Sequence, residues 1–118
     1  MKTRIAINGF GRIGRNLFRL LLNHPTIEVV AINDLADKKT MAHLLKYDSI
    51  HGVLPQKVGS DEKGILVEEE HFLFFHEKEI LKLPWKSLKI NYVIEATGKY
   101  KTFEELNAHI IAGAKKVI

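Results

Sequence analysis

The chain has 118 residues, of which 46% are hydrophobic and 27% are charged, and it contains no cysteine. This length and composition fit one soluble globular domain and exclude a disordered or fibrous chain. The lack of cysteine excludes disulfides, cysteine-ligated zinc, iron–sulfur clusters and a thiol nucleophile within these residues.

Charge and targeting signals narrow the possible roles further. The net charge is +4, but the basic residues are scattered and are not interleaved with aromatic residues as in a nucleic-acid platform. Nucleic-acid binding is therefore not expected as the main role. No stretch approaches the roughly 20 apolar residues of a membrane span. The apolar run near the start is too short for a signal peptide, so we expect a cytoplasmic protein without a membrane segment.

The beginning of the chain predicts a strand, a helix and a second strand. Residues 4–8 and 27–33 are short apolar runs of the kind found in parallel strands that are covered on both faces. Between them, apolar residues recur at helical spacing and predict an amphipathic helix that Pro25 ends. The expected apolar face of this helix consists of Ile13, Leu17, Leu20 and Leu21.

The remainder predicts further alternation of helices and strands. Asp37 is positioned to cap a second helix that ends near Tyr47, and residues 48–52 follow as a loop. Residues 53–89 are less regular, and their glycines and aromatic residues suggest short antiparallel strands joined by turns. Three further elements are predicted: a strand at 92–96, a helix with a capping box at Thr102 and Glu105 that Gly113 ends, and a strand at 115–118.

A glycine-rich loop connects the first strand to the first helix. Gly9, Gly11 and Gly14 have the G-x-G-x-x-G spacing of dinucleotide-binding loops, in the strand-to-helix context that this motif requires. Gly9 allows a tight turn, Gly11 lets a pyrophosphate approach the backbone, and Gly14 lets the helix pack closely on the sheet. The amides near Arg12 and Ile13 lie at the positive end of the helix dipole and can bind phosphate without a metal.

An acidic residue stands where a dinucleotide site needs one. Asp34 follows Gly14 by 20 residues and ends the second strand, where a carboxylate can accept hydrogen bonds from the adenosine ribose. The same charge repels a 2′-phosphate and favours NAD over NADP, although Lys38 and Lys39 nearby leave that preference open. Thr97 ends a later strand, so it is expected to line the same crevice. The alternative is a simple tight turn at residues 9–14 with Asp34 as a helix cap.

Other candidate sites are weaker. The six histidines lack the helical spacing of a zinc pair, and His71 and His76 would face opposite sides of one strand. No metal site is expected. The acidic run at residues 68–70 is interpreted as a solvated turn, and the aromatic run at residues 72–75 as core.

Longer runs around these motifs resemble the amino-terminal domain of the glyceraldehyde-3-phosphate dehydrogenase family. The resemblance covers essentially the whole chain in the family's order and spacing. It rests on Asn8-Gly9-Phe10-Gly11-Arg12-Ile13-Gly14-Arg15, Asn33-Asp34-Leu35, Leu44-Leu45-Lys46-Tyr47-Asp48-Ser49, His51-Gly52, Pro84-Trp85, Glu95-Ala96-Thr97-Gly98 and Gly113-Ala114-Lys115-Lys116-Val117-Ile118.

The resemblance implies a fold and a cofactor. It implies an α/β domain of the Rossmann type over residues 1–118: a doubly wound, mostly parallel sheet with a small antiparallel insertion. NAD is the implied cofactor, with no catalytic or metal-ligating residue in this part. Lys78 stands where the family usually has an arginine near the adenine, and the proline usual in that segment is missing. The implied cofactor-binding residues are Asn8, Gly9, Phe10, Gly11, Arg12, Ile13, Gly14, Asn33, Asp34, Lys78, Thr97 and Gly98.

The resemblance also implies a glycolytic, homotetrameric enzyme that oxidises glyceraldehyde 3-phosphate with NAD and inorganic phosphate. The family's catalytic cysteine and histidine lie beyond Ile118, so we expect a truncated chain that is inactive alone and self-associates. Two alternatives remain open. One is the NAD domain of erythrose-4-phosphate dehydrogenase, which shares this domain, and the other is a standalone nucleotide-binding module.

Overall fold

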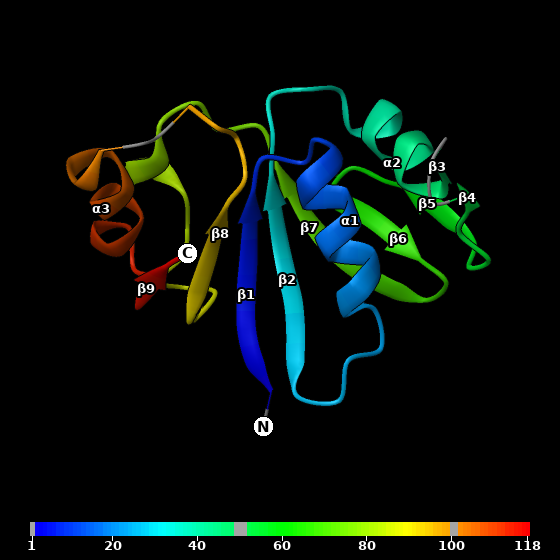
Figure 1. The fold of residues 1–118 in the computed structure, drawn as a ribbon, viewed down its shortest axis with the longest axis horizontal. Helices are drawn as coiled ribbons and strands as arrows, with labels where there is room; N and C mark the ends of the chain where they lie inside the picture. Colours follow the sequence, from blue (N-terminus) through cyan, green and yellow to red (C-terminus); the bar gives the residue numbers. More distant parts are fainter. Residues whose placement is uncertain (1, 49–51, 100–101) are drawn as a thin grey trace.

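The computed structural model describes residues 2–48, 52–99 and 102–118 (Figure 1). Its main sheet has seven strands. Across the sheet they follow the order β5 (Val58–Ser60), β6 (Gly64–Val67), β7 (Glu70–Phe75), β2 (Ile27–Asn33), β1 (Thr3–Asn8), β8 (Tyr92–Glu95) and β9 (Lys116–Val117). A separate antiparallel pair consists of β3 (Tyr47–Asp48) and β4 (Gly52–Val53), where the sequence had suggested only a loop.

The main sheet is mostly parallel, as predicted. β1 pairs in parallel with β2 and β8, and the pairs β2–β7 and β8–β9 are parallel as well. β5 and β6 are antiparallel to each other and form the predicted small insertion, with β6 antiparallel to β7. The aromatic strand β7 differs from the expectation of a purely antiparallel segment. It pairs in parallel with β2 on one side and antiparallel with β6 on the other, and its Phe72 and Phe74 side chains are buried in the core.

Helices flank the sheet, and the predicted caps of the second and third helices are confirmed, whereas the first helix ends at Leu21, ahead of the predicted stop at Pro25. The Asp37 side chain accepts a hydrogen bond from the Thr40 amide, and Thr102 and Glu105 form a capping box. Gly113 adopts a φ of 125°, a conformation that side chains disfavour, just after the last helix. Within the described ranges, no helix is long and apolar enough to cross a bilayer. The helices are α1 (Arg12–Leu21), α2 (Lys38–Lys46) and α3 (Phe103–Ile111), with a 3-10 helix, η1 (Ile80–Lys82).

Both faces of the sheet are buried, which explains why its central strands are almost entirely apolar. Ile5 and Ile7 of β1 belong to one cluster, which includes Phe18 of α1 and residues of α2. Ala6, between them, belongs to a second cluster with Trp85 and residues near α3. The alternation of side chains along β1 therefore joins two cores on opposite faces, the doubly wound arrangement predicted from the sequence.

Helix α1 packs only partly through the predicted face: Leu21 packs against the core and Leu17 is half-buried, but Ile13 and Leu20 are not buried. Its buried residues are Gly14 and Phe18, whereas Ile13 is 72% exposed and Leu20 is 77% exposed. Phe18 meets Phe10 with ring centroids 5.6 Å apart, in an edge-to-face arrangement. A Cβ at Gly14 would meet the Gly9 carbonyl oxygen and, at 3.2 Å, Ile7 of β1, so the side of the helix at Gly14 and Phe18 is the one that becomes buried.

Candidate functional site: a cleft at the ends of the parallel strands

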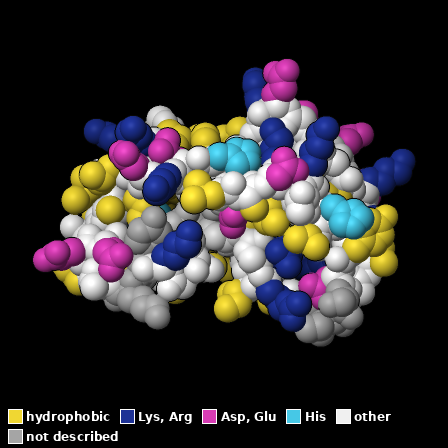
Figure 2. All heavy atoms as spheres, turned by 90° about the horizontal axis from the view of Figure 1, so that it is seen from above, with side chains coloured by type: hydrophobic (Ala, Val, Ile, Leu, Met, Phe, Trp, Pro, Cys, Tyr) yellow, Lys and Arg dark blue, Asp and Glu magenta, His cyan; other side chains and the backbone are white. Residues whose placement is uncertain are grey.

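A cleft of about 230 Å³ opens beside the carboxyl ends of β1, β2 and β8. The chain proceeds from β1 outward to β2 and β7 on one side and then returns to β8 on the other side of β1. Ligands of doubly wound sheets bind in the crevice at this switch point. Figure 2 views the molecule onto this edge, where acidic and basic side chains are interspersed and no single sign of charge dominates.

The cleft brings together most of the residues that the sequence predicts as cofactor-binding. They come from the ends of β1, β2 and β8 and from the segment that follows β7, although these elements are far apart along the chain. The predicted residues in its wall are Asn8, Gly9, Gly11, Asn33, Asp34, Lys78 and Thr97.

The other predicted residues lie around the cleft and not in its wall. Phe10 belongs to the glycine loop, but its ring is fully buried in the core. Gly14 is buried within the first turn of α1, while Arg12 and Ile13 are exposed on the same turn. Gly98 follows β8 in an exposed turn with a φ of 73°.

The glycine loop is shaped by close backbone contacts. Gly9 has a φ of 100°, and a Cβ there would lie 2.7 Å from the Thr97 nitrogen. A Cβ at Gly14 would collide with the Gly9 carbonyl oxygen. At Gly11, by contrast, a Cβ would meet no heavy atom within 4 Å among the described residues. Two glycines are therefore needed for packing, and the third faces open space from which a ligand can approach the backbone.

The first turn of α1 is suited to an anion. Gly11 is the N-cap and has no side chain with which to occupy the first amides of the helix. The first turn also contains no acidic residue, so nothing there opposes a negative ligand. The positive end of the helix dipole and the free amides of Arg12 and Ile13 together match the needs of a phosphate.

Asp34 follows β2 on one side of the cleft and connects this side to the glycine loop. Its Oδ2 accepts a hydrogen bond from the Phe10 amide at 2.6 Å, and its Oδ1 accepts one from the Ala36 amide at 2.8 Å. A carboxylate offers about four acceptor positions, so two remain for hydroxyl groups of a ligand. Asp34 therefore both anchors the loop and keeps the capacity to bind a ribose.

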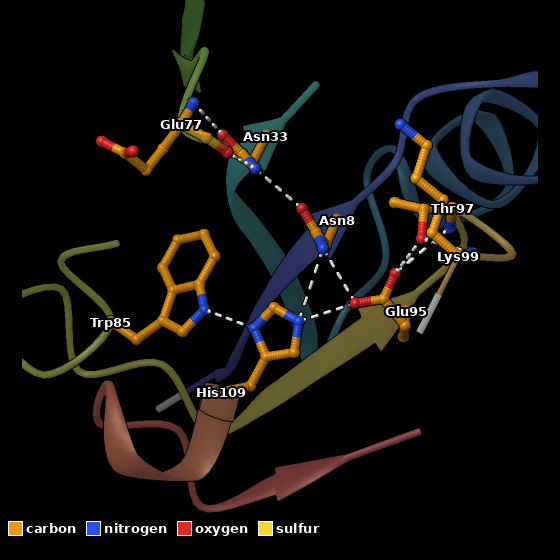
Figure 3. Close-up of polar contacts among 8 residues, drawn as sticks. All are labelled: Asn8, Asn33, Glu77, Trp85, Glu95, Thr97, Lys99 and His109. Atoms are coloured by element: carbon orange, nitrogen blue, oxygen red, sulfur yellow. Dashed lines mark hydrogen bonds and ion pairs between the residues drawn. The ribbon is translucent and has the colours of Figure 1, made fainter. Parts of the chain in front are cut away.

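A hydrogen-bonded network of side chains underlies the cleft (Figure 3). Asn33 Nδ2 donates to Asn8 Oδ1 at 2.8 Å, and Asn33 also exchanges two hydrogen bonds with the backbone of Glu77. Asn8 Nδ2 donates in turn to Glu95 Oε2 at 2.8 Å. Asn8 and Asn33 are 2% and 4% exposed, so these bonds satisfy polar groups that water barely reaches.

The network continues to the other face of the sheet through Glu95. Its Oε1 accepts hydrogen bonds from the Thr97 hydroxyl at 2.7 Å and the Thr97 amide at 3.2 Å. Its Oε2 lies 2.6 Å from His109 Nε2. Burial raises the pKa of Glu95, but hydrogen bonds from His109, Asn8 and Thr97 outweigh burial and hold the pKa below its ordinary value.

Several of these residues were missed in the sequence. Leu35, Glu77, Ala96 and Lys99 also line the cleft, and Trp85, Glu95 and His109 form the network behind it. A glutamate in the apolar strand Tyr92–Glu95 was an available signal, because a charged residue in a buried strand needs a partner. Nothing in the spacing of His109 indicated that α3 would bring it to that glutamate.

The described part of the chain contains no group of three or more histidine, aspartate and glutamate side chains placed to hold a metal ion. Lys78 and Lys99 supply the positive charges in the wall of the cleft.

Comparisons with known proteins agree on one family. The family described as "Glyceraldehyde 3-phosphate dehydrogenase, NAD binding domain" matches residues 3–103. The chain is 52% identical over 117 residues to glyceraldehyde-3-phosphate dehydrogenase of Thermotoga maritima, covering 98% of this chain and 35% of that protein. It is 47% identical over 116 residues to glyceraldehyde-3-phosphate dehydrogenase 1 of Bacillus cereus, covering 98% of this chain and 35% of that protein. The chain spans about 35% of the length of these relatives.

Proposed function

The chain belongs to the family of NAD-binding domains of glyceraldehyde-3-phosphate dehydrogenase, and we propose that it binds NAD in the cleft beside β1, β2 and β8. NAD is the cofactor of this family of domains. The observation that supports the proposed location most strongly is the open space at Gly11 between the first turn of α1 and the Asp34 carboxylate.

The proposed roles follow from the donors and acceptors around the cleft. The amides of Arg12 and Ile13 bind the pyrophosphate, and Gly11 allows its close approach. Asp34 accepts hydrogen bonds from the adenosine ribose with the acceptor positions that its two backbone bonds leave free. Lys78, Thr97 and Gly98 complete the site that the sequence predicts, together with Asn8, Gly9, Phe10, Gly14 and Asn33.

The same geometry supports a preference for NAD over NADP. A 2′-phosphate would lie against the Asp34 carboxylate, and the two negative charges would repel each other. Lys38 lies in the first turn of α2 and Lys39 follows it, and neither lines the cleft. These two lysines are thus outside the wall of the cleft that also contains Asp34.

We propose further that these residues serve an enzyme that oxidises glyceraldehyde 3-phosphate with NAD and inorganic phosphate in glycolysis. NAD supplies the hydride acceptor for such an oxidation. The reaction also needs a nucleophilic thiol, and these 118 residues contain no cysteine. By themselves they are therefore expected to bind the cofactor without turning over an aldehyde. A cytoplasmic location is part of the same proposal.

Exposed apolar side chains on α1 and α3 offer surfaces for association. Ile13 and Leu20 of α1 are 72% and 77% exposed, and Phe103 of α3 is 81% exposed. Apolar side chains exposed to this degree favour contact with another protein surface. We propose that the 118 residues self-associate and that the complete enzyme is a homotetramer.

Calorimetric titration of the folded chain with NAD and with NADP tests the cofactor assignment. The expected result is saturable NAD binding with weaker NADP binding, and no reduction of NAD when glyceraldehyde 3-phosphate and phosphate are added. A well-folded chain without affinity for NAD would overturn the proposal. Erythrose-4-phosphate dehydrogenase would use the same cofactor, so kinetics of a full-length enzyme with both aldehydes separate the two substrates.

A further inference from the structure

We propose that His109, which does not line the cleft, is a positioning residue for the cofactor site: it holds the Glu95 carboxylate that orients Asn8 and Thr97. The inference rests on the NAD binding proposed above. It concerns a residue on α3, on the face of the sheet opposite α1, and Figure 3 shows the path from His109 to the cleft.

The histidine and the glutamate form a closed pair. The His109 side chain is 0% exposed and the Glu95 side chain is 5% exposed. Water therefore has little access to replace a hydrogen bond that either group loses, and each bond must be made within the protein. Trp85 Nε1 lies 3.0 Å from His109 Nδ1 on the other side of the imidazole.

The partners define which nitrogen of His109 carries the proton. An indole nitrogen can only donate, so His109 Nδ1 must accept the hydrogen bond from Trp85. Nε2 then carries the hydrogen and donates it to Glu95 Oε2 at 2.6 Å. Asn8 Nδ2, which lies 3.4 Å from the same nitrogen, is also a donor and directs its hydrogen to Glu95 Oε2.

This arrangement divides the acceptors of Glu95 between two sets of donors. Oε2 accepts from His109 and Asn8, which leaves Oε1 for the hydroxyl and amide of Thr97. Without the His109 donor, the carboxylate would lose its shortest hydrogen bond, and Oε2 would keep only the bond from Asn8. The atoms that would move as a result belong to Asn8 and Thr97.

Both of these residues belong to the wall of the cleft. The Thr97 hydroxyl accepts a hydrogen bond from the Lys99 amide, and the Thr97 nitrogen stands where a Cβ on Gly9 would come within 2.7 Å. A shift of Thr97 therefore displaces either the turn after β8 or the glycine loop. His109 in this way influences how Thr97 is placed against Gly9, and both residues line the cleft.

Two substitutions separate this role from a general contribution to stability. The amide nitrogen of Gln in His109→Gln reaches the place of Nε2 and keeps the donor to Glu95, while the acceptor for Trp85 is lost. The amide oxygen of Asn in His109→Asn takes the place of Nδ1 and keeps the acceptor for Trp85, while the donor to Glu95 is lost. We expect NAD affinity to fall about tenfold in H109N and to change by less than about twofold in H109Q, as for loss of one hydrogen bond to a charged group.

The control is His71→Asn, which removes another contact between a histidine and a carboxylate, the exposed pair of His71 with Asp61 at 2.9 Å. It should leave NAD affinity unchanged. Equal losses of affinity in H109Q and H109N, or no loss in either, would overturn the proposal, because the effect would then not follow the donor to Glu95.

The protonation of His109 in the unmodified chain provides a test that does not depend on folding of a variant. Long-range proton–nitrogen NMR spectra at neutral pH are expected to show a hydrogen on Nε2 and none on Nδ1. A hydrogen on Nδ1 would overturn the proposal. If the unmodified chain bound no NAD, the proposed function would fail separately. The positioning role would then be decided by the chemical shifts of the Asn8 and Thr97 backbone amides. These shifts should change in H109N and stay close to those of the unmodified chain in H109Q.

Discussion

Two alanine substitutions within the glycine loop should differ in their effect on stability. Gly11→Ala adds a methyl group that meets nothing within 4 Å among the described residues, whereas Gly14→Ala adds one that collides with the Gly9 carbonyl oxygen. The first methyl group occupies the space through which a pyrophosphate approaches the backbone. The second occupies space that the folded chain itself needs.

The expected magnitudes follow from these contacts. At Gly11, with a φ of −73°, alanine stiffens the unfolded chain but is a poorer N-cap. These opposing effects, each under about 1 kcal/mol, leave the free energy of unfolding nearly unchanged. At Gly14 the collision is with rigid backbone, and overpacking of about 1–3 kcal/mol exceeds the roughly 1 kcal/mol that alanine gains from helix propensity. G11A should therefore lose NAD affinity without losing stability, while G14A should lose both.

Urea unfolding followed by fluorescence of the single tryptophan, Trp85, measures the stabilities, and calorimetric titration with NAD measures the affinities. A loss of one pyrophosphate contact predicts that G11A binds NAD about tenfold more weakly than the unmodified chain. Unchanged affinity in G11A would refute the placement of the pyrophosphate at this loop. Unchanged stability in G14A would refute the idea that α1 rests on the Gly9 carbonyl.

Three further outcomes follow from the same geometry. Asp34→Asn should weaken NAD binding about tenfold and reduce the preference for NAD over NADP, as measured by titration with both cofactors. An unchanged preference would count against a role of this carboxylate at the ribose. Because hydrogen bonding lowers the folded-state pKa of Glu95, its stabilisation should be complete above the ordinary carboxyl pKa and lost as pH falls through the lowered value. Urea unfolding between pH 3 and pH 6 should therefore be less pH-dependent in Glu95→Gln, and an identical pH dependence would contradict the assigned contacts. Leu20→Gln should reduce self-association in sedimentation experiments, with Leu81→Gln as the control at another exposed leucine; equal behaviour of the two would argue against α1 as the contact.

The sequence was sufficient to predict the elements that depend on local signals. The glycine spacing, the apolar runs of β1 and β2, and the caps at Asp37 and Thr102 each act within a few residues, so they are visible without knowledge of tertiary contacts. The position of Asp34 at the end of β2 follows from the same local rules. Its place in the cleft then follows from the parallel order of the strands.

The features that escaped prediction depend on contacts between distant segments. The buried face of α1 is determined by Gly14 against the Gly9 carbonyl, and a glycine adds nothing to an apolar periodicity. The stripe through Ile13 and Leu20 therefore had the stronger pattern, although it faces outward. The same limit applies to His109, whose partner Glu95 belongs to another element and is identified only when α3 packs on the sheet.

The order of strands in the sheet also has a consequence for how the chain is made. β1, α1, β2 and β7 lie within the first 75 residues and can pair as soon as they leave the ribosome, whereas β8 begins only at Tyr92. One wall of the cleft is thus absent until residues 92–95 have been made, and the Asn8 side chain then joins Glu95 across 87 residues of sequence. Closing so long a loop is slow compared with local pairing. During translation, the nascent chain therefore assembles one half of its sheet well before it gains a place where a nucleotide can bind.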